Sequence, residues 1–151
     1  IARRQRQMCI RDSTYSGHPV ACAVALANLD LMEAEQLPQK VRGEIGAYFA
    51  QRYAELNEHP LVGVAETCGF VGGLVLVKNK VTKERFREDD AVGMICRGHC
   101  FGNGLIMRAV GDRMIIAPPL VMTRSDIDEM MRLIRQALDL TLQDLKARGL
   151  V

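Results

Sequence analysis

The chain has 151 residues and a mass of 16.8 kDa, enough for one domain with a hydrophobic core of its own. Hydrophobic residues make up 48% and charged residues 25%, values typical of globular proteins, which exclude a disordered or fibrous chain. The longest uncharged apolar run, residues 20–29, is too short to cross a bilayer. With 5% aromatic residues and no Trp, the composition also argues against a base-stacking surface for nucleic acid. We therefore expect a soluble domain with neither a membrane nor a nucleic-acid partner.

The net charge of +2 is unevenly distributed along the chain. Residues 1–13 contain four Arg and one Asp, whereas the remainder contains 16 basic and 17 acidic residues. Residues 1–13 also show no helical or strand periodicity, so we interpret them as a non-native or disordered leader, with a genuine basic arm as the alternative. The cysteines are odd in number and scattered, which predicts reduced thiols and a cytoplasmic protein; they are Cys9, Cys22, Cys68, Cys96 and Cys100.

The first half of the chain predicts two helices and a pair of strands. Pro19 can occupy a first helical position, and the following residues 20–27 are apolar on every side, so this helix is expected to be buried. A second helix is predicted over 39–57, although Gly43 and Gly46 weaken the prediction. Residues 61–67 and 70–77 are rich in Val and Leu and predict two adjacent strands or an antiparallel hairpin.

The second half predicts a helix, two short strands and a final helix. A helix over 90–101 is followed by Gly102-Asn103-Gly104, a helix-ending sequence. Strands are predicted over 105–108 and 114–117 around a tight turn at 110–113. Thr123 and Asp126 resemble a capping box that begins a long amphipathic helix. This order of elements predicts an α+β fold in which helices cover a mainly antiparallel sheet.

One hydroxyl-rich segment, Thr14-Tyr-Ser-Gly-His-Pro19, directly precedes the first predicted helix. Free N–H groups at a helix start, together with nearby hydroxyls, bind phosphate well. An ordinary helix cap and turn explains the same residues. The sequence leaves both interpretations open.

A lone arginine, Arg108, ends the predicted strand 105–108. Its planar guanidinium suits a substrate carboxylate, but an ion pair with Asp112 across the turn is an equal alternative. The segment Cys96-Arg-Gly-His99-Cys100 offers potential metal ligands, yet the sequence contains no second Cys/His pair to complete a zinc site. We therefore interpret it as a buried helix face and expect no metal.

Several motifs occur together in the order and spacing of one family. They are T-Y-S-G-H-P-V-A-C-A-V-A at 14–25, V-K-N-K at 77–80, G-M-I-C-R at 93–97 and N-G-L-I-M-R-A-V-G-D-R-M-I-I-A-P-P-L-V-M-T at 103–123. On these residues the chain from Thr14 onward resembles the class III aminotransferases. Within that family it is most similar to the omega-transaminases, a subgroup that includes putrescine–pyruvate and beta-alanine–pyruvate transaminases.

The resemblance implies a type I fold that depends on pyridoxal 5'-phosphate (PLP), and a homodimer. Residues 14–36 would end the large PLP-binding domain, and residues 37–151 would form the C-terminal small domain. Thr14 matches the family's threonine that binds the PLP phosphate of the partner subunit. Arg108 matches the mobile arginine that binds the substrate carboxylate.

The family's Schiff-base lysine lies upstream of the threonine motif, where this chain has only its leader. The lysines of the chain match structural positions instead; they are Lys40, Lys78, Lys80, Lys83 and Lys146. We therefore expect a C-terminal fragment of an enzyme that transfers an amino group between a diamine or omega-amino compound and pyruvate, with no catalytic residue in this chain and no activity by itself. The alternative is a non-catalytic small-molecule or protein-interaction module on the same α+β domain.

Overall fold

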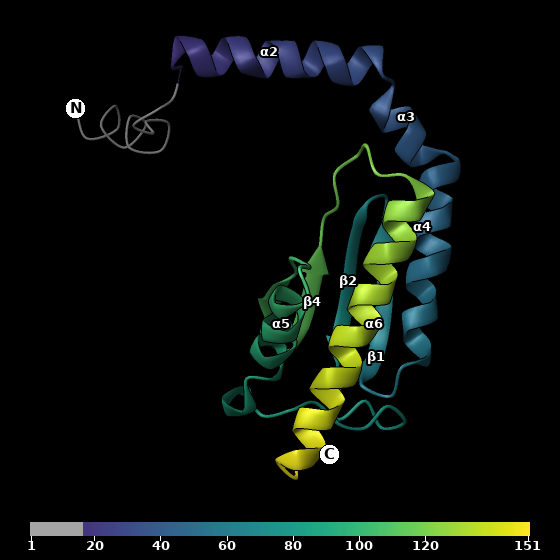
Figure 1. Ribbon diagram of the computed structural model, residues 1–151, viewed down its shortest axis with the longest axis vertical. Helices are drawn as coiled ribbons and strands as arrows, with labels where there is room; N and C mark the ends of the chain where they lie inside the picture. Colours follow the sequence, from purple (N-terminus) through teal and green to yellow (C-terminus); the bar gives the residue numbers. More distant parts are fainter. Residues whose placement is uncertain (1–16) are drawn as a thin grey trace, which may run out of the picture. The chain divides into compact units, whose positions relative to one another are not determined.

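A computed structural model of the chain describes residues 17–151, so the leader and Thr14 lie outside the described residues. The chain divides into two compact units, one up to Gln36 and one from Leu37 to Val151. The first contains the helix α2, Pro19–Ala34. The second contains the helices α3 (Leu37–Arg42), α4 (Glu44–Ala54), α5 (Val92–Gly102) and α6 (Arg124–Ala147), and the strands β1 (Val62–Cys68), β2 (Val71–Leu76), β3 (Arg108–Val110) and β4 (Arg113–Ile116) (Figure 1).

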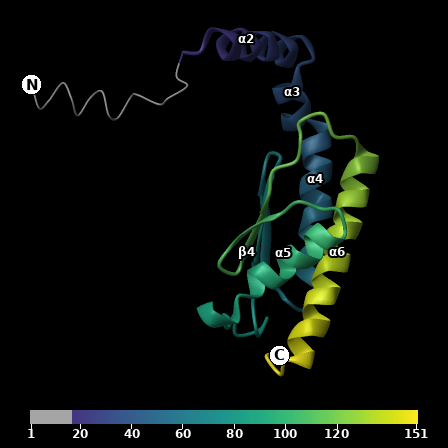
Figure 2. The same ribbon diagram turned by 60° about the vertical axis from the view of Figure 1, so that its left-hand side comes forward.

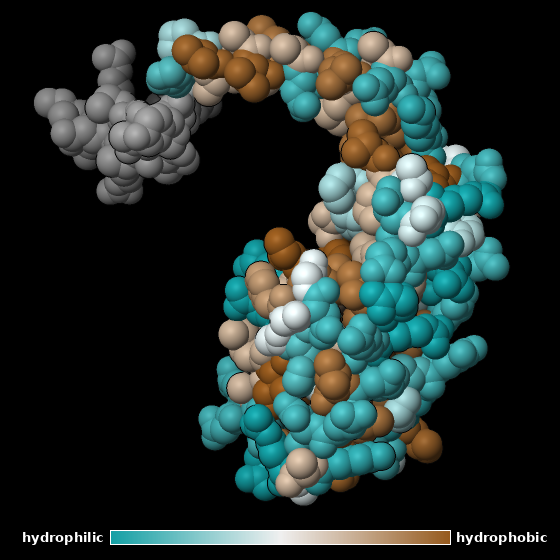
Figure 3. All heavy atoms as spheres, viewed as in Figure 1, coloured by the Kyte–Doolittle hydropathy of each residue, from teal (hydrophilic) through white to brown (hydrophobic). Residues whose placement is uncertain are grey.

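The helix α2 forms as predicted, with Pro19 at its start, but none of its residues is buried. Burial was expected because its residues are apolar on every side. Among the described residues of its own unit, however, α2 is the only regular element, so its side chains have no neighbouring element of that unit to pack against. The space-filling view shows the resulting run of hydrophobic surface along α2 (Figure 3).

The single helix predicted over 39–57 is divided in three. It consists of α3, α4 and a short 3₁₀ helix, η1, at Glu55–Glu58. Gly43 separates α3 from α4 with non-helical backbone angles (φ −90°, ψ −142°). A Cβ at Gly46 would lie 1.9 Å from the carbonyl oxygen of Val41, so the break also requires a glycine at this close approach.

The four strands form one antiparallel sheet in the order β1-β2-β4-β3. The strands β1 and β2 form a hairpin through Gly69, whose positive φ of 56° suits glycine. The strand β3 begins at Arg108, later than the predicted start at residue 105. The reason is that the Leu105 N–H donates to the Cys100 carbonyl (2.9 Å), so this residue closes α5 before the strand begins.

The core lies on one face of the sheet. Along β2, Gly72, Leu74 and Leu76 are buried, whereas Val71 on the other face is half exposed. The helices α4, α5 and α6 lie on the same side of the sheet (Figure 2), and α6 packs against both α4 and α5. The predicted α+β fold with helices on an antiparallel sheet is thus confirmed.

The long helix α6 begins as its sequence predicts. The Thr123 hydroxyl accepts from the Asp126 N–H and the Asp126 carboxylate accepts from the Thr123 N–H, which completes the capping box. The apolar stripe of α6 is buried and faces the core; it consists of Ile127, Met130, Met131, Ile134, Ala137, Leu138 and Leu145.

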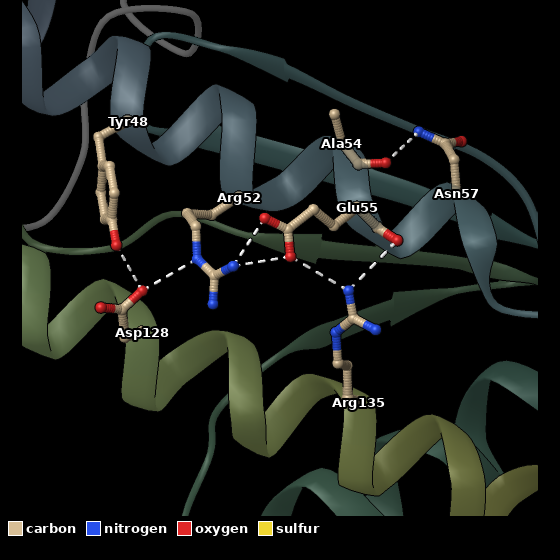
Figure 4. A network of polar contacts seen from close by, with 7 residues as sticks. All are labelled: Tyr48, Arg52, Ala54, Glu55, Asn57, Asp128 and Arg135. Carbon is tan, nitrogen blue, oxygen red and sulfur yellow. Dashed lines mark hydrogen bonds and ion pairs between the residues drawn. The ribbon is translucent and has the colours of Figure 1, made fainter.

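A polar network joins α6 to α4 outside the core (Figure 4). The Asp128 carboxylate accepts from the Tyr48 hydroxyl (2.7 Å) and from Arg52 Nε (2.9 Å). The Glu55 carboxylate accepts hydrogen bonds from both Arg52 and Arg135. The hydrogen bond from Tyr48 holds the pKa of Asp128 below its usual value, so this carboxylate is ionised at neutral pH. These contacts link α6 to α4 and to the 3₁₀ helix η1.

Candidate carboxylate-binding site

Of the two residues that the family resemblance assigns to a site, the structure describes only Arg108. Thr14, assigned to the PLP phosphate, lies outside the described residues, so its role stays a prediction. No described residue was assigned to the cofactor. The geometry of the described residues therefore concerns the substrate side of the predicted site.

Arg108 is the first residue of β3, and its side chain is exposed. The alternative ion pair with Asp112 is wrong, because Asp112 lies 3.3 Å from Nε of Arg85 instead. Arg85 precedes the strand by more than twenty residues, so local spacing could not identify it as the partner. Within residues 17–151 the guanidinium of Arg108 has no hydrogen-bond or ion-pair partner. Its five N–H donors remain available for an anion.

Arg108 lines a surface hollow of about 290 Å³ beside the end of α5. The other lining residues are Arg97, Phe101, Ile106, Met107 and Ala109. Ile106 and Phe101 are 75% and 46% exposed, so the hollow combines open apolar surface with two cationic groups. This arrangement suits a small ligand that carries a carboxylate and a short apolar portion.

Sequence reasoning placed Arg97 in a helical motif but missed its position beside Arg108. Its guanidinium carbon lies 4.9 Å from the ring centroid of Phe101, one helical turn further along α5. The spacing of four residues between an arginine and an aromatic residue was the signal for this stacking. Arg97 borders the hollow because β3 packs against α5. The local sequence does not reveal this packing.

The segment 96–100 forms the buried helix face that was predicted. Cys96 and Cys100 are almost fully buried in the core, and the hydrogen bond to Cys96 together with burial raises the pKa of the Cys100 thiol. His99 lies at the edge of this face, with Nε2 2.9 Å from Asp144 Oδ2 on α6. These side chains join α5 to the core and to α6.

The part of the chain that the structure describes contains no helix both long and apolar enough to span a membrane.

Comparisons with known proteins agree on one family. The family model "Aminotransferase class-III" matches residues 4–138, a range that begins within the leader. The putrescine–pyruvate aminotransferase of Pseudomonas aeruginosa is 58% identical over 128 residues, which cover 85% of this chain and 28% of that protein. The mitochondrial gamma-aminobutyrate transaminase 1 of Oryza sativa subsp. indica is 33% identical, again over 85% of this chain and 25% of its own length.

Solved structures of transaminases have the same fold over most of the chain. A transaminase from directed evolution by ancestral reconstruction is 40% identical with a TM-score of 0.81, covering 89% of this chain and 30% of its own. The (S)-enantioselective omega-transaminase from Thermomicrobium roseum is 36% identical with a TM-score of 0.79, covering 87% of this chain and 29% of its own.

The fold is that of a segment of an omega-transaminase, and the chain belongs to the class III aminotransferase family. It spans about 28% of the length of the first relative named above.

Proposed function

We propose that the chain is the C-terminal part of a PLP-dependent omega-aminotransferase that transfers an amino group between a diamine or omega-amino compound and pyruvate. The observation that carries this proposal is the 58% identity with a putrescine–pyruvate aminotransferase, well above the 33% identity with the gamma-aminobutyrate transaminase. The longer protein would be a cytoplasmic homodimer. Residues 14–36 would end its large domain and residues 37–151 would form its small domain.

PLP, when bound, supplies the electron sink that makes transfer of the amino group possible. Thr14 would hold its phosphate across the dimer interface through the hydroxyl and backbone N–H. None of the chain's lysines matches the catalytic position of the family, so the activity is proposed for the longer protein.

Arg108 would bind the carboxylate of pyruvate in this enzyme. Three properties of the described residues support this role: the guanidinium is exposed, it has no partner within residues 17–151, and it borders a hollow with apolar sides. A guanidinium that is not committed to an internal ion pair can donate two parallel hydrogen bonds to a carboxylate. It can also move aside for an amine that has no carboxylate.

In the longer enzyme, the variant Arg108→Ala should raise the KM for pyruvate while leaving the KM for putrescine nearly unchanged. A hydrogen bond to a charged group contributes about 1.5–3 kcal/mol, so the expected rise is about 10- to 100-fold. Steady-state kinetics with each substrate varied in turn, following alanine formation, measures both constants.

The matched control is Arg113→Ala. Arg113 is an exposed arginine on the neighbouring strand β4 and does not line the hollow. It should leave both KM values unchanged. Equal effects of Arg108→Ala on the two substrates would contradict the carboxylate role, and an enzyme that forms no alanine from putrescine and pyruvate would contradict the proposed reaction.

A further inference from the structure

Two guanidinium groups border one hollow, and none of the described residues that line it is acidic. Arg97 comes from α5 and Arg108 from β3. The remaining lining residues are uncharged. Two positive charges without a counterion create a local field that attracts anions and repels cations. The hollow is therefore more strongly selective for anions than Arg108 alone would make it.

The guanidinium of Arg97 is oriented by an aromatic ring and not by a carboxylate. Its guanidinium carbon lies over the Phe101 ring, 4.9 Å from the centroid, and among the described residues its side chain makes one hydrogen bond, a weak one from Nη1 to the Met94 sulfur (3.9 Å). Stacking uses the flat face of a guanidinium and leaves the N–H donors at its edge free. Arg97 is thus held in place and can still donate hydrogen bonds.

We propose that Arg97 is a second carboxylate-binding residue, which shares the carboxylate of the keto-acid substrate with Arg108. This inference rests on the proposed function, because it assigns a further residue to the same site. The second cation would strengthen binding of the carboxylate substrate. It would also disfavour entry of the ammonium end of a diamine into this hollow, because like charges repel there.

The test uses the longer enzyme with Arg97→Gln, which removes the charge and keeps a polar side chain of similar reach. The KM for pyruvate should rise about tenfold, as expected for loss of one charge-assisted hydrogen bond at a partly exposed site. The KM for putrescine should stay unchanged or fall, and kcat at saturation should stay unchanged. Arg97→Lys should restore part of the affinity for pyruvate because it keeps the charge but loses the planar fork.

Two further variants separate binding from folding. Phe101→Leu removes the ring beneath Arg97 and should raise the pyruvate KM by a smaller factor than Arg97→Gln. Arg113→Gln is the control for loss of an exposed arginine and should change neither constant. Thermal unfolding of each variant, followed by circular dichroism, identifies a general loss of structure. If Arg97→Gln does not fold, the comparison of Arg97→Lys with the unmodified enzyme still measures the loss of the planar fork.

The proposal is overturned if the pyruvate KM of Arg97→Gln equals that of the unmodified enzyme, or if both substrates are affected alike. If Arg108→Ala shows its pyruvate-specific effect while Arg97→Gln shows none, only the role of Arg97 fails. If neither variant shows a pyruvate-specific effect, the carboxylate site of the proposed function fails as well.

Discussion

His59 is a partly buried histidine, and the hydrogen bond that its Nδ1 accepts requires the neutral form of the ring. Its Nδ1 accepts from the Leu61 N–H (3.2 Å), and its Nε2 lies 3.3 Å from Asp139 Oδ1. The side chain is 9% exposed. Burial lowers the pKa of His59, and the hydrogen bond and charge of Asp139, which raise it, only partly offset this effect.

The free energy of unfolding should therefore fall as the pH drops below the ordinary histidine pKa of about 6.5. Because the pKa of His59 is lower in the folded chain than in the unfolded chain, the unfolded chain binds the proton more readily. The contribution of His59 to the free energy of unfolding is therefore complete above about pH 6.5 and is lost as the pH falls toward the folded-state pKa. Urea unfolding at about pH 7.5 and 5.5 measures the loss. His59→Asn should show a smaller loss across this interval than the unmodified chain.

The matched control is His18→Asn, at the exposed start of α2, which should keep the pH dependence of the unmodified chain. An equal loss in His59→Asn and the unmodified chain would show that His59 does not couple protonation to folding.

At the scale of elements, the start of α5 lies directly against the turn between β3 and β4. A Cβ at Gly93 would lie 2.0 Å from the carbonyl oxygen of Gly111 in that turn, a distance that atoms cannot adopt without a shift of the backbone. Gly98 lies one and a half turns further along the same helix, where a Cβ would meet nothing within 4 Å. The two glycines thus differ in surroundings but share one helix.

Gly93→Ala should lower the free energy of unfolding by about 1–3 kcal/mol, because the added methyl group forces α5 away from the hairpin. Gly98→Ala should raise it by up to about 1 kcal/mol through better helix propensity at an exposed position. Urea unfolding of both variants measures the difference. Similar changes of the same sign in both variants would show that α5 can move away from the turn without cost.

The elements predicted well from sequence are those whose signals are local. The helix α6 has its cap and its apolar stripe within its own residues, and both were recognised. The break at Gly43 was indicated only by Gly43 and Gly46, which lower helix propensity without fixing where a helix ends. At the site, the contacts join segments further apart in the sequence. Arg108 was singled out because it ends the predicted strand 105–108, although the observed strand β3 begins at this residue. The partner of Asp112 and the place of Arg97 depend on packing between distant segments.

At the scale of the whole molecule, the two units differ in how they are stabilised. The buried hydrophobic residues that form the core all belong to the unit from Leu37 to Val151. The unit up to Gln36 contributes α2, whose apolar side chains remain exposed (Figure 3). They include Val20, Val24, Leu26, Leu29 and Leu31, each more than half exposed. Contiguous apolar surface of this kind favours association.

Removal of residues 1–36 should therefore leave the fold of residues 37–151 intact and reduce self-association. The thermal midpoint should change by less than about 2 °C, because no residue of the hydrophobic core is lost. Light scattering and binding of a hydrophobic dye should both fall. The double variant Val24→Glu, Leu29→Glu of the 151-residue chain should reduce association to a similar extent, which would assign the effect to the apolar side chains of α2. A marked drop in the thermal midpoint on removal of residues 1–36 would instead show that these residues stabilise the second unit.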